Sequence, residues 1–199
     1  MKPLQCTDVG PPEVLKLKRF DKPAPSDSEL LITVAATSVT PGDCEMPTCT
    51  IHPTMYLFFR LFIGITKPRK PVLGMYFSGT VEAVGNDIKS YEVGDEVFGT
   101  TGLTIGTNAE YVCVPASRSF IKKPKSLSHC QAAATPIGAW NALHFIRLAK
   151  LKPGEKILVF GAGGAIGTFA IQLAKLAGAT VTAVDSKDKL SMLTQTGAD

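Results

Sequence analysis

The sequence predicts an α/β fold in two parts, an antiparallel β-rich part over residues 1–125 and a parallel strand–helix–strand unit within residues 126–199. Three observations support this fold class. Short β-branched runs separated by glycine and proline fill the N-terminal part. Helical spacing of apolar residues begins after Ser126. The C-terminal part then contains an apolar run, a glycine-rich turn, a helical pattern and a second apolar run.

The strands expected in the N-terminal part are short and end at turn residues. They fall at 15–17, 29–39, 79–84, 96–98 and 109–114. Strands this short, connected by Gly/Pro turns, are typical of an antiparallel barrel-type domain.

The apolar stretch at residues 55–65 interrupts this pattern. It is too short to span a membrane, which takes about 20 apolar residues. It is either a helix packed in the core or an apolar wall for a hydrophobic substrate. Aromatic stripes are more often part of the core, and this favours the first interpretation.

Residues 158–185 carry the most informative pattern. The strand at 157–160 is stopped by the glycine turn 161–164, and Gly178 ends the helix that follows. A second strand at 180–184 closes the unit. The side chains of the helix that recur at helical spacing, and that we expect to lie on the sheet, are Ile166, Ala170, Leu173, Ala174 and Ala177.

The turn has the form A-x-G-x-x-G, preceded by one more glycine. A strand before it, a helix after it and an acid eighteen residues beyond Gly167 form the context of a dinucleotide-binding turn. In that context the helix N-terminus directs free N–H groups and a positive dipole end at a pyrophosphate. The predicted cofactor-binding residues are Gly161, Ala162, Gly163, Gly164, Ala165, Ile166, Gly167 and Asp185. The alternative is a tightly packed glycine turn without a ligand.

Composition excludes several classes of function. A chain of 199 residues with 45% hydrophobic content can bury a sizeable core. The net charge of +4, without a long basic run, does not indicate nucleic-acid binding. The N-terminus lacks the apolar segment of a secretory signal, so we expect reduced cysteines and a cytoplasmic location, with no membrane span.

Further motifs occur in one order along the chain. They are Ser38-Val39-Thr40-Pro41-Gly42-Asp43, Leu73-Gly74-Met75-Tyr76-Phe77-Ser78-Gly79, Val93-Gly94-Asp95-Glu96-Val97-Phe98-Gly99 and Ala109-Glu110-Tyr111-Val112. Together with the glycine turn they resemble the medium-chain dehydrogenase/reductase superfamily, and most closely its zinc-independent, quinone oxidoreductase-like branch. The resemblance implies a GroES-like catalytic domain over 1–125 and the N-terminal part of a Rossmann domain over 126–199, with the nicotinamide in the cleft between them.

The resemblance also bears on zinc. Zinc-dependent members carry a cysteine three residues before the position of Asp43 and a histidine after the first glycine of segment 74–79. This chain has Thr40 and Met75 there, and the stretch 99–111, where structural-zinc cysteines are expected, contains no cysteine. Catalytic zinc takes three protein ligands such as His, Cys or Glu. We therefore expect neither zinc site.

A competing metal interpretation starts from the C-x4-C-x2-H cluster of Cys44, Cys49 and His52, which His129 and Cys130 would complete. The spacing matches no common structural-zinc pattern, and the two halves lie far apart in the sequence. A buried free thiol is the more frequent state of cysteine. The sequence therefore predicts no metal site.

Without a Lewis-acid metal, nothing lowers the pKa of an alcohol or polarises a plain carbonyl. A reduced nicotinamide still delivers hydride to a conjugated acceptor, so we expect an NAD(P)H-dependent oxidoreductase acting on a quinone or an α,β-unsaturated carbonyl. The catalytic candidates are Thr40, as a hydrogen-bond partner of substrate or ribose, Asp43, as an orienting group, and Tyr76, as a proton donor. Their alternatives are a strand-end residue, a turn residue and a packing residue, respectively.

The sequence contains residues that favour NADH and residues that favour NADPH. Asp185 would pair with the ribose hydroxyls and repel a 2′-phosphate, which slightly favours NADH. Ser186, Lys187 and Lys189 form a short cluster able to hold that phosphate, so the prediction is NAD(P)H. The resemblance implies a further residue near the nicotinamide, and one of several alignments puts Asn141 there.

The superfamily continues for four further strands after the second Rossmann strand, so residues 126–199 provide only part of that sheet. Two alternatives therefore stay open beside the quinone or enone reductase. One is a truncated, catalytically inactive fragment or interaction module, and the other is an NAD(P)-dependent alcohol dehydrogenase. For the full-length protein we expect a homodimer or homotetramer.

Overall fold

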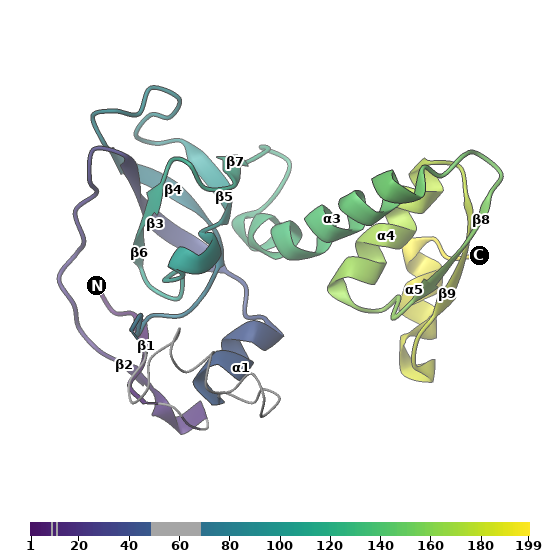
Figure 1. Cartoon of the computed structure of the whole chain (residues 1–199), viewed down its shortest axis with the longest axis horizontal. Coiled ribbons are helices and arrows are strands. Elements are labelled where there is room, and N and C mark those ends of the chain that lie inside the picture. Colours follow the sequence, from purple (N-terminus) through teal and green to yellow (C-terminus); the bar gives the residue numbers. More distant parts are fainter. Residues whose placement is uncertain (9, 11, 49–68) are drawn as a thin grey trace. The chain divides into compact units, whose positions relative to one another are not determined.

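The computed structural model describes residues 1–8, 10, 12–48 and 69–199 of the chain (Figure 1). They fold as two compact units, Met1–Ala134 and Thr135–Asp199. Helix α3, His129–Ala149, begins in the first unit and continues in the second. The stretch 55–65, Cys49 and His52 lie outside the described residues, so the interpretations given to them remain predictions. The domain boundary expected near residue 125 likewise remains a prediction.

Among the described residues, the first unit is built on an antiparallel five-stranded sheet in the order β6-β3-β4-β5-β7. Its strands are β3 Glu29–Thr37, β4 Tyr76–Val84, β5 Glu96–Thr100, β6 Tyr111–Pro115 and β7 Phe120–Lys122. The remaining elements are the antiparallel pair β1 Leu4–Cys6 and β2 Leu15–Leu17, helix α1 Pro41–Thr48, and 3-10 turns at Pro12–Val14 and Gly102–Thr104. The β-rich antiparallel character predicted from the sequence is confirmed, and β1 and β7 are additional strands.

Side chains of the two central strands form the core of this unit. Leu30 and Ile32 of β3, and Phe77 and Val81 of β4, are almost completely inaccessible to solvent. The cluster also contains Ile88, Val97, Val112, Val114 and Phe120. Because successive side chains of a strand point to opposite faces, a one-residue slip would move this set out of the core. The apolar pattern therefore fixes the register of the sheet.

The second unit contains the predicted strand–helix–strand unit. Strands β8, Lys156–Phe160, and β9, Thr180–Val184, pair in parallel and are connected by α4, Ala165–Leu176. A 3-10 turn at Lys187–Lys189 leads into α5, Leu190–Thr196. The core consists of Val159, Ala162, Ile171, Ala174, Ala179, Val181 and Leu193. The predicted α/β fold class is confirmed.

The buried face of α4 differs in part from the one expected from its apolar spacing: Ala174 is buried as expected and Ala170 packs against the core, but Ile166 does not face the sheet. Ile166 is 41% exposed, whereas Gly167, Ile171 and Ala174 are buried. The reason is Gly167, which packs directly under the glycine turn: a Cβ there would lie 2.6 Å from the Cα of Ala162. Residues four and seven positions later share the face of Gly167, so Ile171 and Ala174 face the sheet.

This register yields a stability prediction for α4. Ile171→Ala should lower the free energy of unfolding by about 2–5 kcal/mol, because it opens a cavity in a fully buried site. Ile166→Ala should cost clearly less, because Ile166 is already partly exposed. Urea denaturation followed by the fluorescence of Trp140, the only tryptophan of the chain, measures both. Equal losses for the two variants would contradict this register.

Candidate functional site

In the first unit, Thr40 and Asp43 form a closed pair at the beginning of α1. The N–H and Oγ of Thr40 donate to Oδ2 of Asp43 at 2.9 and 2.8 Å, and the N–H of Asp43 donates to the carbonyl of Thr40 at 2.9 Å. This is half of a capping box, because the acid at the third helical position accepts the N–H of Thr40, whereas the Thr40 hydroxyl donates to the acid and does not accept its N–H; Pro41 occupies the first helical position. Both side chains are buried. The two catalytic candidates are therefore in direct contact.

Asp43 also ties α1 to the segment 73–76. Its second oxygen, Oδ1, accepts the N–H of Gly74 at 3.0 Å. Gly74 has a φ of +93°, and a Cβ there would lie 2.3 Å from the Oγ of Thr107, so glycine is required. The buried carboxylate thus accepts three hydrogen bonds from two segments. This geometry fits the orienting role expected of Asp43.

Backbone carbonyl groups of segment 73–76 also accept hydrogen bonds from neighbouring segments. The N–H of Thr101 donates to the carbonyl of Met75 at 2.8 Å, and the Oγ of Thr37 donates to that of Tyr76 at 2.8 Å. The carbonyl of Gly74 accepts the N–H of Gly106 at 2.8 Å. Thr101 and Thr107 are completely buried. The sequence does not single out these threonines, because a buried threonine has no sequence signal that separates it from an exposed one.

Tyr76, the third catalytic candidate, begins β4 and is half-buried. Burial, and to a smaller extent the negative charge of Asp43, raise the pKa of Tyr76. The phenol therefore keeps its proton at neutral pH and is a weaker acid than an ordinary tyrosine.

Met75 lies beside the turn that contains Thr40. Its Cε is 3.8 Å from the position that a Cβ on Gly42 would occupy, and the Oγ of Thr40 is 3.6 Å from the same position. The two residues at the expected zinc-ligand positions therefore flank one turn, and they offer a thioether and a hydroxyl. Within the part of the chain that the structure describes, no group of three His, Cys, Asp or Glu side chains is arranged to hold a metal ion.

The side chains of a serine, a histidine and a glutamate form a hydrogen-bonded chain elsewhere in this unit. The Oγ of Ser78 is 2.8 Å from Nδ1 of His129, and Nε2 of His129 is 3.1 Å from Oε1 of Glu96. Ser78 is completely buried and donates to the carbonyl of Val97. A buried serine cannot meet a substrate, so these residues anchor the first turn of α3 to the sheet. Both ring nitrogens of His129 are occupied within the protein.

In the second unit, the glycine turn is closed by the end of β9. The N–H groups of Gly161 and Ala162 both donate to the carbonyl of Val184, at 3.0 and 3.1 Å. Gly164 extends the turn and precedes α4 without a side-chain cap. The first intrahelical bond runs from Thr168 to the carbonyl of Gly164. The N–H groups of Ala165, Ile166 and Gly167 therefore precede the hydrogen-bonded ladder and form the positive end of the helix.

Asp185 completes this turn. Its Oδ2 accepts the N–H of Gly163 at 2.7 Å, and its Oδ1 accepts the N–H of Ser186 at 2.8 Å and lies 3.0 Å from Nζ of Lys189. Hydrogen bonds from Ser186 and Gly163, followed by Lys189, hold the pKa of Asp185 well below its ordinary range. The acid is therefore ionised at neutral pH, and the predicted residues Gly163, Asp185, Ser186 and Lys189 lie together.

These residues fit a dinucleotide. The free N–H groups at the uncapped N-terminus of α4 suit a pyrophosphate. The space beside Gly164 is open to a ligand, because a Cβ there would meet only the carbonyl of Gly161, at 3.4 Å.

The side chain of Asn141 makes a hydrogen bond within its own helix, because its Nδ2 donates to the carbonyl of Ile137 at 2.7 Å. Its expected place near the nicotinamide remains a prediction.

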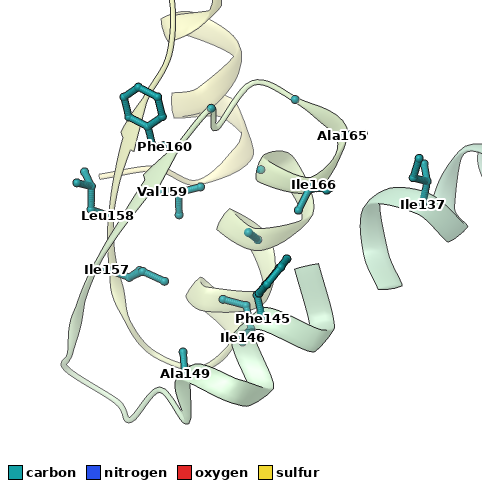
Figure 2. Close-up of a pocket in the computed structure, with 14 residues that line it drawn as sticks. Ile137, Phe145, Ile146, Ala149, Ile157, Leu158, Val159, Phe160, Ala165 and Ile166 are labelled. Carbon is teal, nitrogen blue, oxygen red and sulfur yellow. The ribbon is translucent and has the colours of Figure 1, made fainter. Parts of the chain in front are cut away.

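A groove of about 700 Å³ runs along the second unit next to this turn (Figure 2). It is lined by Ile137, Phe145, Ile146 and Ala149 of α3, residues 157–160 of β8, and Gly161, Gly164, Ala165, Ile166, Gly167 and Ala170 of the turn and α4. None of these side chains is charged or polar.

Comparison with known proteins agrees with this architecture. A family profile described as "Alcohol dehydrogenase GroES-like domain" matches residues 26–125. The mouse (Mus musculus) protein "NAD(P)H oxidoreductase RTN4IP1, mitochondrial" is 37% identical over 180 residues, which cover 86% of this chain and 45% of that protein. The "2-methylene-furan-3-one reductase" of Solanum lycopersicum is 32% identical over 211 residues, and the aligned region covers 100% of this chain and 51% of that protein.

The solved structure of the quinone oxidoreductase from Coxiella burnetii superimposes with a TM-score of 0.85 at 34% identity, over 100% of this chain and 61% of that one. This chain spans about half the length of the curated relatives that it matches. The profile match, the relatives and the superposition agree on one family. The chain belongs to the alcohol dehydrogenase GroES-like family and, within it, to the quinone oxidoreductase-like branch of the medium-chain dehydrogenase/reductase superfamily.

Proposed function

We propose that this protein is an NAD(P)H-dependent oxidoreductase that reduces a quinone or an α,β-unsaturated carbonyl without zinc. The observation that carries the proposal is the closed turn at the beginning of α1. The hydroxyl of Thr40 and the thioether of Met75 lie on either side of this turn. The carboxylate of Asp43 already accepts three hydrogen bonds, from Thr40 and Gly74. Such a set of donors is suited to hydrogen bonding and not to holding a zinc ion.

The chemistry follows from this set of groups. A nicotinamide bound to the second unit supplies the hydride. Without a Lewis acid, a plain carbonyl is a poor acceptor, whereas a quinone or enone delocalises the negative charge that develops. The names of two relatives, an NAD(P)H oxidoreductase and a furanone reductase, support this class of reaction.

Thr40 and Tyr76 take different parts in the proposal. The single proton of the Thr40 hydroxyl is donated to Asp43, so Thr40 offers only acceptor lone pairs to a ligand. This favours an interaction with a ribose hydroxyl over one with a substrate carbonyl. Tyr76 carries a proton at neutral pH and is the candidate proton donor to the reduced acceptor. Its alternative role is that of a packing residue.

For the cofactor, we propose NAD(P)H with a small preference for NADH. The ionised Asp185 repels a 2′-phosphate, and Lys189 partly offsets that charge from 3.0 Å away. The homo-oligomeric state and the cytoplasmic location expected from the sequence also remain proposals. The described part of the chain contains no helix with the length and apolarity needed to cross a membrane.

The first experiment tests the reaction class. The purified chain is assayed for NADH and NADPH oxidation with a quinone, an enone and a simple alcohol, with and without a metal chelator. We expect turnover with the first two acceptors only and no effect of the chelator. Loss of activity with the chelator, together with stoichiometric zinc in metal analysis, would support the alcohol dehydrogenase alternative. Cofactor binding without any turnover would support the inactive-fragment alternative.

The second experiment tests the cofactor preference. Asp185→Ser should shift the NADH/NADPH affinity ratio about 3- to 10-fold toward NADPH, because it removes one negative charge. Asp185→Asn removes the same charge but keeps an acceptor for the N–H of Gly163, and it should shift the ratio in the same direction. Lys189→Ala should shift it toward NADH. Fluorescence titration measures the ratio, and an unchanged ratio in all three variants would rule out these roles.

A further inference from the structure

Hydrogen bonds hold the peptide groups on both sides of the Cα of Tyr76. On one side, the carbonyl of Met75 accepts the N–H of Thr101 at 2.8 Å and the hydroxyl of Thr101 at 3.3 Å. On the other side, the carbonyl of Tyr76 accepts the hydroxyl of Thr37 at 2.8 Å. Because each peptide group is planar, fixing both of them leaves φ and ψ of Tyr76 little freedom. These bonds therefore set the direction of its Cα–Cβ bond.

The contact from Thr37 depends on a register shift in β3. Val34 lies opposite Gly79 of β4, and this register would place Thr37 opposite Tyr76. A shift after Val34 places Thr37 opposite Phe77 instead, at the last pair of the ladder. Shifts of this kind redirect side chains and are over-represented next to active sites. Here the shift brings a side-chain hydroxyl to the carbonyl of Tyr76, just beyond the last backbone pair.

A buried hydroxyl keeps the side chain of Thr37 in this orientation. Thr37 itself is exposed, whereas Thr107, whose Oγ lies 3.0 Å from that of Thr37, is completely buried. Thr37 has one proton, and the carbonyl of Tyr76 is closer to it than Oδ1 of Asn108, at 3.1 Å. The proton of Thr107 is then donated to Thr37. Among the described residues this is the only hydrogen bond of the Thr107 hydroxyl, so a rotation of Thr37 toward water would leave a buried donor unsatisfied.

We propose that Thr37 is a positioning residue for the proton donor Tyr76, an inference that rests on the proposed reduction of a quinone or enone. In that reaction the acceptor gains a hydride and a proton, and the O–H bond of the phenol breaks with its electron pair left on oxygen, which solvent then reprotonates. A general acid must lie within hydrogen-bond reach of the atom that it protonates. The phenol oxygen is at the far end of the ring, so a small rotation of the backbone displaces it most. Thr37 therefore affects kcat through Tyr76.

A double-mutant cycle tests this coupling in the chain, with NADH and a quinone as substrates. Thr37→Val keeps the β-branched shape and removes the hydroxyl, and it should lower kcat about 3- to 10-fold while the KM for NADH stays within about twofold. Tyr76→Phe should lower kcat by at least about tenfold. Thr37→Val added to Tyr76→Phe should have no further effect, because no phenol is left to position.

Two further variants separate the hydroxyl from the strand that carries it. Thr37→Ser keeps the hydroxyl, and its kcat should stay within about twofold of that of the unchanged chain. Thr33→Val is the matched control, because it removes another hydroxyl of β3, which donates to Oε2 of Glu82 at 2.8 Å. It should leave kcat unchanged.

A second readout does not depend on turnover. The ultraviolet titration of the chain, minus that of its Tyr76→Phe variant, follows the ionisation of Tyr76. Burial and the charge of Asp43 raise the pKa of Tyr76, so a phenol that gains water ionises at lower pH. Thr37→Val should therefore shift this titration by about half a pH unit toward lower pH, and Thr33→Val should not shift it.

Three results would overturn the inference and leave the proposed reaction standing. They are an equal effect of Thr37→Val with and without the phenol of Tyr76, a kcat of Thr37→Ser as low as that of Thr37→Val, and an unchanged titration of Tyr76 in Thr37→Val. Full activity of Tyr76→Phe would instead refute the proton-donor role and, with it, the positioning role. In a chain without turnover, the titration alone decides.

Discussion

The glycine turn of the second unit depends on the end of β9, which accepts hydrogen bonds from three successive N–H groups. The carbonyl of Val184 accepts those of Gly161 and Ala162, and the carboxylate of Asp185 accepts that of Gly163. These bonds fix the path of the turn, and Gly167 then packs α4 directly beneath it. The uncapped start of α4 is held in place by these contacts. The candidate cofactor site is therefore a product of the parallel pairing of β8 with β9.

The first unit uses a carboxylate in a similar way. Asp43 is buried and accepts hydrogen bonds from Thr40 and Gly74, so it joins the start of α1 to the segment that carries Met75 and Tyr76. Backbone carbonyls of that segment are held in turn by threonines. This network of hydrogen bonds positions the side chains at the start of α1 and in segment 73–76.

The sequence predicted those features that depend on local pattern. The strand–turn–helix–strand unit follows from spacing over a few residues, whereas the contact between Thr40 and Asp43 was not predicted and is seen only in the structure. The buried face of α4 was predicted only in part. Ala174 is buried as expected, but apolar spacing alone favours Ile166, whereas close packing of Gly167 turns Ile171 inward. Strand β7 was missed because a three-residue strand is defined by its partner β5 and not by its own sequence.

The contacts of Asp185 could not be predicted from the sequence. The sequence indicates an acid at the end of the second strand, but the N–H of Gly163 and the Nζ of Lys189 reach it only in the folded unit. Those contacts add a structural role for the acid, because Asp185 supports the turn in addition to its proposed interaction with a ribose. Such contacts depend on long-range packing and hydrogen bonding, which the local motif does not specify.

The central claim is that the second unit binds a dinucleotide through its glycine turn, and an NMR titration of the isotope-labelled chain with NADH tests it most directly. The account predicts saturable shifts concentrated at the N–H groups of Ala165 and Ile166 and at Asp185 and Ser186. Saturation without shifts at these residues, or no change at all, would contradict it.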